Sequence, residues 1–329
     1  MNFTSIIFSS FSFLILSTLM LMSSNSWLVI WICLELNMFS FIPIIMWDIH
    51  NYEEEGAIKY FIIQILASSL LLISIFYSLN LFSLYFMSML SLMLSVCIKV
   101  GSFPFYFWYP SVMKSMSWFK CLILSTWQKL GPLSILIFYI KDYSKILIFI
   151  SLMNIFIGGW MGFMQSDLRA LMAYSSISHL GWMMSMMGST YNLFSLLYFL
   201  TYLILVIPIF SILMLFNIYK LTLMFSMSKV AMNYSFSLML LILSLSGLPP
   251  LSGFMPKLMV LSIMMNENML MVVMMVIFSS MSMYMYLNMF FTLYIYYCMN
   301  MSMLKIFCNP MFILSLIVSL MFLPLFWLY

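Results

Sequence analysis

The feature that most limits how this chain can fold is a series of apolar runs, each of about the 20 residues that a helix needs to cross a bilayer. Inside a bilayer every backbone polar group needs a partner within the protein, so only helices and closed barrels can span it. A barrel would require apolar and polar residues to alternate, and these runs do not alternate. The sequence therefore predicts an all-α polytopic membrane protein.

The composition supports this class and excludes others. Only 6% of the 329 residues are charged, whereas about a quarter are charged in a typical soluble domain. The net charge of +4 comes without a run of Lys and Arg, so we expect no nucleic-acid partner. The five cysteines are odd in number and contain no CxxC motif, so we expect neither a disulfide framework nor a metal site.

About eleven transmembrane helices are expected. We place them at 3–22, 26–46, 57–79, 82–108, 112–140, 145–164, 168–187, 192–218, 233–265, 269–296 and 308–327. The spans 82–108 and 233–265 are longer than a simple crossing needs, and both contain Gly and Pro, in "KVGSFPF" and "GLPPLSGFMPK". We expect both helices to be broken.

The two broken spans occupy matching places along the chain, because each is the fourth in a set of five. This pattern predicts two inverted five-helix repeats, 1–142 and 143–298, followed by a C-terminal helix in 299–329. An odd number of helices makes the second repeat enter the membrane from the opposite side. Broken segments at matching places in two repeats indicate a transport pathway.

The basic residues of the loops predict the orientation of the chain. With the N-terminus on one side, that side carries seven basic residues and the other carries two, which favours the N-terminal side as the inside. The seven are Lys59, Lys114, Lys120, Arg169, Lys220, Lys229 and Lys305, and the two are Lys141 and Lys145.

Four ionisable residues fall within spans: Glu35, Lys99, Lys129 and Lys257. A charge at the centre of a bilayer costs about 2.5–3.5 kcal/mol on insertion scales, so these residues should face the protein interior or water. A buried ion pair that only fixes helix packing would explain one acid and one base, and would leave two lysines over. All three lysines lie beside a Gly/Pro break, where freed backbone groups can solvate a proton carrier. A lysine whose acidic partner approaches and retreats changes its proton affinity, which is the simplest proton-pumping element.

The Ser-rich span 168–187 carries a further ionisable residue, His179. A histidine in a membrane helix is either a hydrogen-bonded interior residue or a member of a proton relay, and the sequence leaves both interpretations open. In the preceding span, Gly158 and Gly162 form a GxxxG motif that predicts close helix packing.

Five stretches, in their order and spacing, carry a family resemblance: "WICLELNM", "KVGSFPFYFW", "TWQKLGP", "DLRALMAYSSISHLGWM" and "GLPPLSGFMPK". They resemble the chain 2 family of antiporter-like membrane subunits of mitochondrial NADH:ubiquinone oxidoreductase, respiratory complex I. The resemblance covers nearly the whole chain. It implies one antiporter-like transmembrane domain over 1–329 that translocates protons while partner subunits transfer electrons from NADH to ubiquinone.

The resemblance also implies roles for particular residues. Glu35 and Lys99 would form a modulating pair, Lys129 would link two half-channels, and Lys257 would pass protons toward the far side. Where many relatives have His in "PFHFW", this chain has Tyr106, so a proton-accepting ring at that position is not expected to act in the same way.

The same resemblance implies where the chain works and with what. It would lie in the mitochondrial inner membrane with its N-terminus in the matrix, in contact with the lipid bilayer. Its partners would be other membrane-arm subunits, including neighbouring antiporter-like subunits. The chain would take part in the NADH:ubiquinone reductase reaction without a redox centre of its own. NADH, FMN, iron–sulfur clusters and ubiquinone would be bound by the partners.

Two alternatives remain at this level. A stand-alone cation/proton antiporter would work without redox partners, although a cation site needs oxygen ligands and only one acid lies within a predicted span. A structural spacer would keep the lysines without using them.

Overall fold

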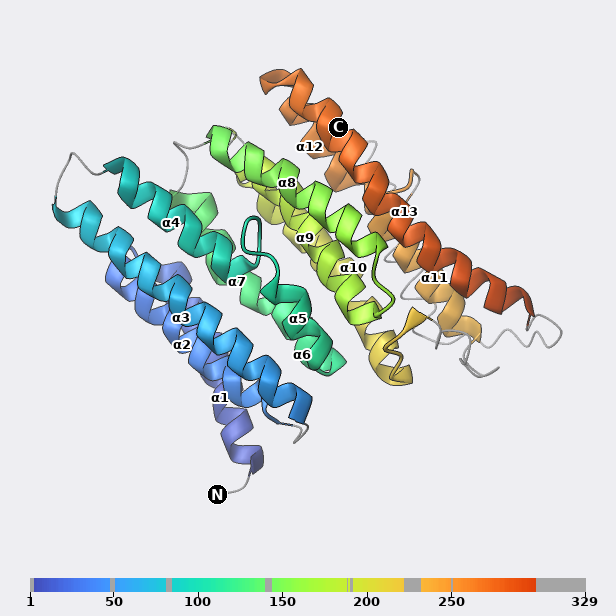
Figure 1. Cartoon of the computed structure of the whole chain (residues 1–329), viewed down its shortest axis with the longest axis horizontal. Coiled ribbons are helices and arrows are strands. Elements are labelled where there is room, and N and C mark those ends of the chain that lie inside the picture. Colours follow the sequence, from blue (N-terminus) through green and yellow to red (C-terminus); the bar gives the residue numbers. More distant parts are fainter. Residues whose placement is uncertain are drawn as a thin grey trace. The chain divides into compact units, whose positions relative to one another are not determined.

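The computed structural model of this chain describes residues 3–47, 51–80, 85–139, 144–187, 189, 192–221, 232–249 and 251–299. Within these ranges the secondary structure is helical apart from one isolated bridge between Asp167 and Lys220. The chain divides into two compact units, Met1–Tyr143 and Ser144–Tyr329 (Figure 1). The predicted last helix, 308–327, lies outside the described residues.

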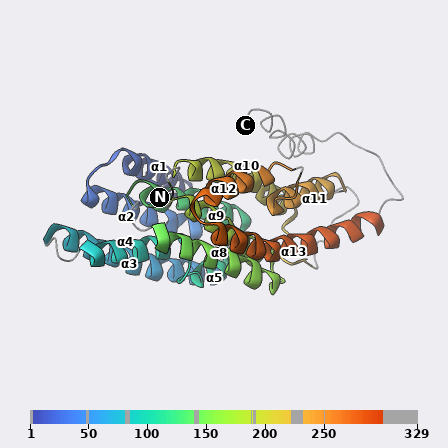
Figure 2. The same cartoon turned by 90° about the horizontal axis from the view of Figure 1, so that it is seen from above.

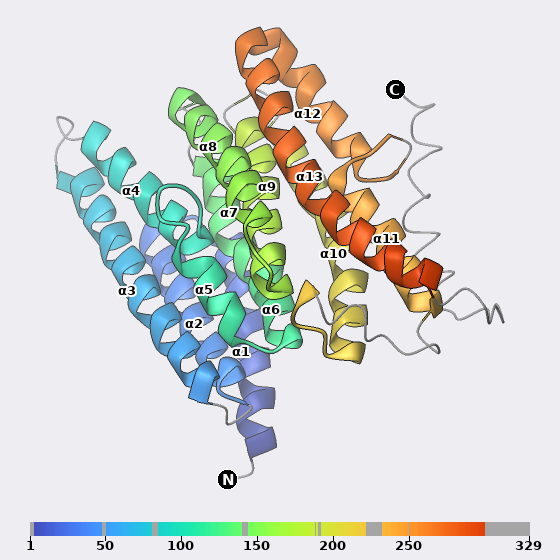
Figure 3. The same ribbon diagram turned by 45° about the vertical axis from the view of Figure 1, so that its right-hand side comes forward.

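The first unit begins with three long helices that lie side by side (Figure 1, Figure 3). Its helices are α1 (Phe3–Ser23), α2 (Trp27–Ile45), α3 (Asn51–Asn80), α4 (Tyr85–Val100), α5 (Trp108–Ser115), α6 (Trp118–Ser125) and α7 (Trp127–Tyr139). Helix α3 packs along α4, and α7 packs against α4 and α1. The broken span formed by α4 and α5 is therefore held between α3 and α7.

The second unit also opens with three uninterrupted helices. Its helices are α8 (Ser144–Phe163), α9 (Leu168–Met187), α10 (Phe194–Phe216), α11 (Met232–Ser246), α12 (Phe254–Glu267) and α13 (Met269–Met299). Helix α8 lies against both α9 and α13 (Figure 2). A Cβ added at Gly158 would lie 2.7 Å from the Cβ of Ser178 on α9, which confirms the close packing predicted from the GxxxG motif.

Helix α9 is the buried centre of the second unit. All of its residues except Arg169 are buried, which is typical of a helix surrounded by other helices. The hydroxyl groups of its serines find hydrogen-bond acceptors within the helix. Ser175, Ser176, Ser178 and Ser185 each donate a hydrogen bond to the carbonyl oxygen three residues earlier, at 2.7–2.8 Å. The helix can therefore carry many hydroxyl groups through an apolar core.

Some predicted boundaries are wrong. The span predicted at 112–140 is not one helix, because it begins inside α5, and Met116 and Ser117 adopt extended backbone between α5 and α6. A further interruption at Thr126 separates α6 from α7, where the Thr126 hydroxyl donates to the carbonyl of Leu122 at 2.6 Å, a back-bond that bends helices. Helix α3 begins at Asn51 rather than 57, with acidic residues in the first turn, where the helix dipole favours them.

The chain is a multi-pass membrane protein. Seven of the described helical segments are long and apolar enough to cross a membrane: Ser5–Ser23, Trp27–Ile45, Tyr52–Ser78, Trp118–Tyr139, Lys145–Phe163, Phe194–Phe216 and Met269–Ile295. Their outward positions carry large apolar side chains, among them Phe8, which is 79% exposed, and Leu200, which is 52% exposed. Exposed apolar surface over whole helices suits contact with lipid or with other membrane helices.

Candidate functional site

The first broken span ends its first half immediately after Lys99. Gly101 adopts a φ of +76°, and the N–H groups of Gly101 and Ser102 both donate to the carbonyl of Cys97 at 3.0 Å. This tight stop turns the chain away from the helix axis, as a left-handed glycine does at a helix end. Lys99 is 6% exposed, so its charged group lies inside the unit.

Two side chains donate hydrogen bonds to backbone carbonyl groups at the end of α4, where the helix is broken. The amide of Gln64 donates to the carbonyl of Lys99 at 3.3 Å, and the indole N–H of Trp108 donates to the carbonyl of Ile98 at 3.0 Å. The last carbonyls of a helix have no partner within it, and at membrane depth they need one from elsewhere in the protein. Helices α3 and α5 thus stabilise the open end that holds Lys99.

Lys129 lies in the first turn of α7, directly after the interruption at Thr126. Two residues further on, Gly131 and then Pro132 follow, and Pro132 has no N–H to offer the carbonyl of Gln128. The Lys129 side chain is 2% exposed. Its ammonium nitrogen lies 4.9 Å from the centre of the Tyr109 ring, within the range of a cation–π interaction.

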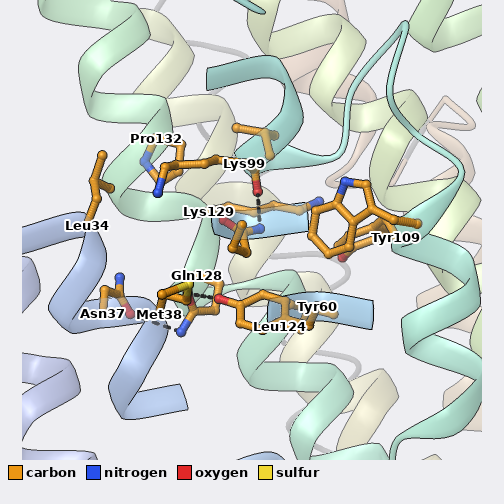
Figure 4. A pocket seen from close by; sticks show the side chains of 13 residues that line it. Leu34, Asn37, Met38, Tyr60, Lys99, Tyr109, Leu124, Gln128, Lys129 and Pro132 are labelled. Atoms are coloured by element: carbon orange, nitrogen blue, oxygen red, sulfur yellow. Dashed lines mark hydrogen bonds between the residues drawn. The ribbon is translucent and has the colours of Figure 1, made fainter. Parts of the chain in front are cut away.

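Lys99 and Lys129 line the same small cavity, of about 20 Å³ (Figure 4). About 10–15 Å³ is enough for one water molecule, provided that it finds two to four polar partners. The wall also holds a chain of hydrogen bonds, in which the Tyr60 hydroxyl donates to Gln128 at 3.2 Å and the Gln128 amide donates to Asn37 at 3.0 Å. The cavity therefore has the size and the polar groups to hold water between two lysines.

Glu35 lies on α2, next to Leu34, which lines this cavity. It is half-buried, and its carboxylate interacts electrostatically with both Lys99 and Tyr60. In the part of the chain that the structure describes, no ion pair of 4.0 Å or less joins Glu35 to Lys99. The structure thus brings the acid near its predicted partner without direct contact.

The second broken span places Lys257 against its own break. Helix α11 ends at Ser246, and the Lys257 ammonium donates to the Ser246 carbonyl at 2.8 Å. Gly247 has a φ of +76°, and a Cβ built on it would lie 2.9 Å from the Lys257 nitrogen. Glycine is needed here both for the backbone conformation and for the space that the lysine occupies. Lys257 also lies 5.7 Å from the centre of the Trp182 ring on α9.

His179 lies one turn before Trp182 on α9 and is 6% exposed. Its Nδ1 lies 2.9 Å from the Tyr198 hydroxyl, and its Nε2 lies 3.3 Å from the Tyr286 hydroxyl. Both ring nitrogens are thus hydrogen-bonded, which fits an interior residue and equally fits a residue that passes a proton from one nitrogen to the other.

A buried ion pair in the first unit is absent from the sequence predictions. The ammonium of Lys120 lies 2.6 Å from a carboxylate oxygen of Glu53, and both side chains are almost fully buried, at 2% and 5% exposure. Counting Lys120 among the loop lysines is therefore wrong. Glu35 is also not the only acid in the helices, because α3 begins early enough to include Glu53.

Tyr106 is buried against Phe107 and does not line the cavity of Lys99 and Lys129.

Comparison with known proteins places the chain in a family. The model of the NADH:quinone oxidoreductase/Mrp antiporter transmembrane family matches residues 24–282. NADH-ubiquinone oxidoreductase chain 2 of Lumbricus terrestris is 44% identical over 258 residues, which cover 78% of this chain and 77% of the relative. The same protein of Locusta migratoria is 38% identical over 262 residues, with 78% and 76% covered.

Solved structures share the fold at lower identity. A chain of respiratory complex I from Thermus thermophilus with bound Aureothin matches with a TM-score of 0.81 and 21% identity, over 97% of this chain and 77% of that one. A chain of the Mrp complex from Dietzia sp. DQ12-45-1b matches with a TM-score of 0.74 and 14% identity, over 84% and 58%. The chain belongs to the NADH:quinone oxidoreductase/Mrp antiporter transmembrane family, and within it to the NADH-ubiquinone oxidoreductase chain 2 relatives.

Proposed function

We propose that this chain is a proton-translocating membrane-arm subunit of NADH:ubiquinone oxidoreductase. The names of the chain 2 relatives support the complex, and the family supports transport. The observation that carries the proposal is the cavity of about 20 Å³ that Lys99 and Lys129 share. A protonated lysine can pass a proton through one water molecule to a neutral lysine amine on the other side of the cavity, whereas a purely structural spacer has no use for such a cavity.

In the first unit the proposed order is Glu35, Lys99 and Lys129. Glu35 already acts on Lys99 at longer range, so a small approach or retreat of the carboxylate would change how strongly Lys99 holds its proton. The proton released by Lys99 would pass through the cavity to Lys129. The hydrogen-bonded side chains of Tyr60 and Gln128 would orient the water.

In the second unit the proposed carriers are Lys257 and, beside it, His179. The protonated Lys257 is held at the break by its hydrogen bond to the Ser246 carbonyl. This bond would be lost when the side chain turns away to pass on its proton. His179 lies one helical turn from Trp182, whose ring faces Lys257. Transfer toward the far side of the membrane is assigned to Lys257.

We also propose the finer architecture of two inverted five-helix repeats with a final helix, eleven spans in all. The order of elements supports it, because each unit has three uninterrupted helices followed by a broken span, α4 with α5 and α11 with α12. The N-terminus would lie in the matrix and the chain in the mitochondrial inner membrane.

The energy and the electrons come from elsewhere in this proposal. Moving one proton against 100 mV requires about 2.3 kcal/mol, which proton relay residues cannot supply. Other membrane-arm subunits, including neighbouring antiporter-like subunits, would drive the relay through the bilayer-embedded interface. NADH, FMN, the iron–sulfur clusters and ubiquinone would bind in those partners, and this chain would hold no redox centre.

The test of the proposal is whether the chain comigrates with NADH-oxidising activity on a native gel. Source membranes are solubilised in mild detergent, intact complexes are separated on a native gel, and the chain is located with an antibody. Comigration with NADH-oxidising activity in a very large complex is the expected result. A small band without that activity contradicts the proposal. Cation-dependent proton flux of that band in liposomes would then identify a stand-alone cation/proton antiporter.

A further inference from the structure

We propose that Tyr109 is a positioning residue of the proton relay, whose ring face holds the protonated Lys129 and ties it to the break beside Lys99. The inference rests on the proposed function and adds to it a residue outside the Glu35, Lys99, Lys129 and Lys257 set. Tyr109 is the second residue of α5 and is 1% exposed. It lines the cavity that contains both lysines (Figure 4).

The ring contact with Lys129 depends on the charge of the lysine. The ammonium nitrogen lies 4.9 Å from the centre of the ring, whose face carries the negative part of the aromatic quadrupole. That face attracts a protonated lysine and has little attraction for a neutral amine. The contact is stronger where water is excluded, and both side chains are almost fully buried. The ring therefore favours the proton-loaded state of Lys129.

The Tyr109 ring stabilises the Lys129 charge without preventing Lys129 from releasing its proton. A carboxylate in direct contact with the ammonium group would hold that proton more strongly. An aromatic face is not a base at physiological pH, so it does not take the proton itself. When Lys129 releases its proton, the N–H bond breaks, the electron pair stays on nitrogen, and a water oxygen in the cavity accepts the proton. The reverse transfer reloads the lysine, so no other reactant is needed.

Tyr109 is also fixed by the break next to Lys99. A Cβ added at Gly101, the glycine that ends α4, would lie 2.9 Å from the Cβ of Tyr109. The Tyr109 N–H donates to the carbonyl of Tyr106 at 3.2 Å, inside the same break. Any change in the backbone at the end of α4 must therefore move the ring, and with it the stabilisation of the Lys129 charge. Tyr109 in this way couples the state of Lys99 to that of Lys129.

The second unit contains the same arrangement on different residues. The Lys257 ammonium lies 5.7 Å from the centre of the Trp182 ring, next to its own break at Gly247. Lys120, which has no place in the relay, faces the Glu53 carboxylate instead. A ring face beside a broken helix thus accompanies the proposed proton carriers Lys129 and Lys257, in separate units.

The test compares Tyr109→Phe with Tyr109→Leu in the intact, reconstituted complex. Phe keeps the ring face and removes the hydroxyl, while Leu removes the ring. We expect NADH-driven proton pumping within about twofold of wild type for Phe and a fall of roughly 2- to 30-fold for Leu, the range that cation–π energies imply. The matched control is Tyr139→Leu, which removes a tyrosine of the same unit whose ring contacts Trp27 at 4.5 Å, away from the cavity. It should pump like wild type.

Two results overturn the inference. Wild-type pumping by both the Phe and the Leu variant means that the ring face is not used, and an equal loss of pumping in both means that the hydroxyl group is what matters. If the Leu variant does not assemble, Tyr109→Met fills the space with a flexible side chain, and the same comparison with Phe decides. Failure of the proposed function would appear separately, as a wild-type chain that does not travel with NADH oxidation.

Discussion

Lys120 on α6 and Lys129 on α7 are close in sequence and equally buried, at 2% exposure each, yet their surroundings differ completely. The Lys120 ammonium makes a direct ion pair with Glu53 at 2.6 Å. The Lys129 ammonium faces an aromatic ring and a cavity with room for water, shared with Lys99. A buried lysine in direct contact with a carboxylate holds helices together, because neutralising either group would leave the other as an uncompensated charge in the protein interior. A lysine against a ring and water can change its charge.

The two lysines should therefore respond in opposite ways to removal of the charge. Breaking a buried ion pair by removing one partner leaves an uncompensated charge in the protein interior. Removing a proton carrier leaves the packing intact and stops the transfer. The first change should affect assembly of the complex and the second its pumping.

The largest effect is expected from Lys120→Met. It strands the Glu53 carboxylate in the interior, at a cost of about 3–5 kcal/mol, so little assembled complex should remain. The amount of complex on a native gel and its thermal unfolding temperature measure this. The double variant Glu53→Gln with Lys120→Met removes both charges and should recover most of the complex. Normal assembly of the single variant would mean that the pair contributes little.

The next largest effect is expected from Lys257→Met. The complex should assemble, while proton pumping falls by roughly tenfold or more, because a positioned proton-transfer group is typically worth 10²–10⁴-fold in rate. Lys145→Met is the matched control, since Lys145 is an exposed lysine at the start of α8 in the same unit. Equal pumping by the two variants would remove Lys257 from the relay.

A smaller effect is expected from Gly247→Ala. The positive φ of 76° strains an alanine by roughly 1–2 kcal/mol, and its Cβ would push on the Lys257 side chain at 2.8–2.9 Å. We expect an assembled complex with pumping reduced by roughly threefold to tenfold, between the values for wild type and Lys257→Met, since the lysine is displaced but present. The measurement is NADH-driven acidification in proteoliposomes, and wild-type pumping would show that the position of Lys257 at the break is unimportant.

The smallest effect is expected from Tyr60→Phe. It removes one hydrogen bond, from the Tyr60 hydroxyl to Gln128, while Gln128 keeps its bond to Asn37. A neutral hydrogen bond is worth about 0.5–1.5 kcal/mol, and because Gln128 stays fixed by Asn37 we expect a loss near the low end, a fall in pumping of about twofold to threefold. A complete loss of pumping in assembled complex would instead make the Tyr60 hydroxyl an obligatory member of the proton path.

The sequence is sufficient to predict the breaks and the lysines beside them. Gly and Pro next to Lys99 and Lys257 determine local backbone, so a local pattern reveals them, and both breaks are confirmed. The ion pair of Glu53 and Lys120 could not be predicted, because it depends on how α3 packs near α6, and hydropathy treats a lysine near a helix end as a loop residue. The contact of Tyr109 with Lys129 is hidden for the same reason.

The predicted roles of the site residues stay predictions. The structure brings Lys99 and Lys129 to one cavity and Glu35 near Lys99, which the order of residues along the chain does not reveal. The second ring nitrogen of His179 finds its partner, Tyr286, on a helix far along the chain. Such partners follow from tertiary packing, and only the identity of the ionisable residue itself is visible in the sequence.

The most direct test of the account measures proton pumping and NADH turnover in purified complex that carries Lys129→Met, beside complex that carries the double variant Glu53→Gln with Lys120→Met. We expect both complexes to assemble, the double variant to pump like wild type, and Lys129→Met to lose roughly tenfold or more of its pumping together with turnover. A fully active Lys129→Met complex would contradict the account, because Lys129 would then be a buried lysine without a part in proton transfer.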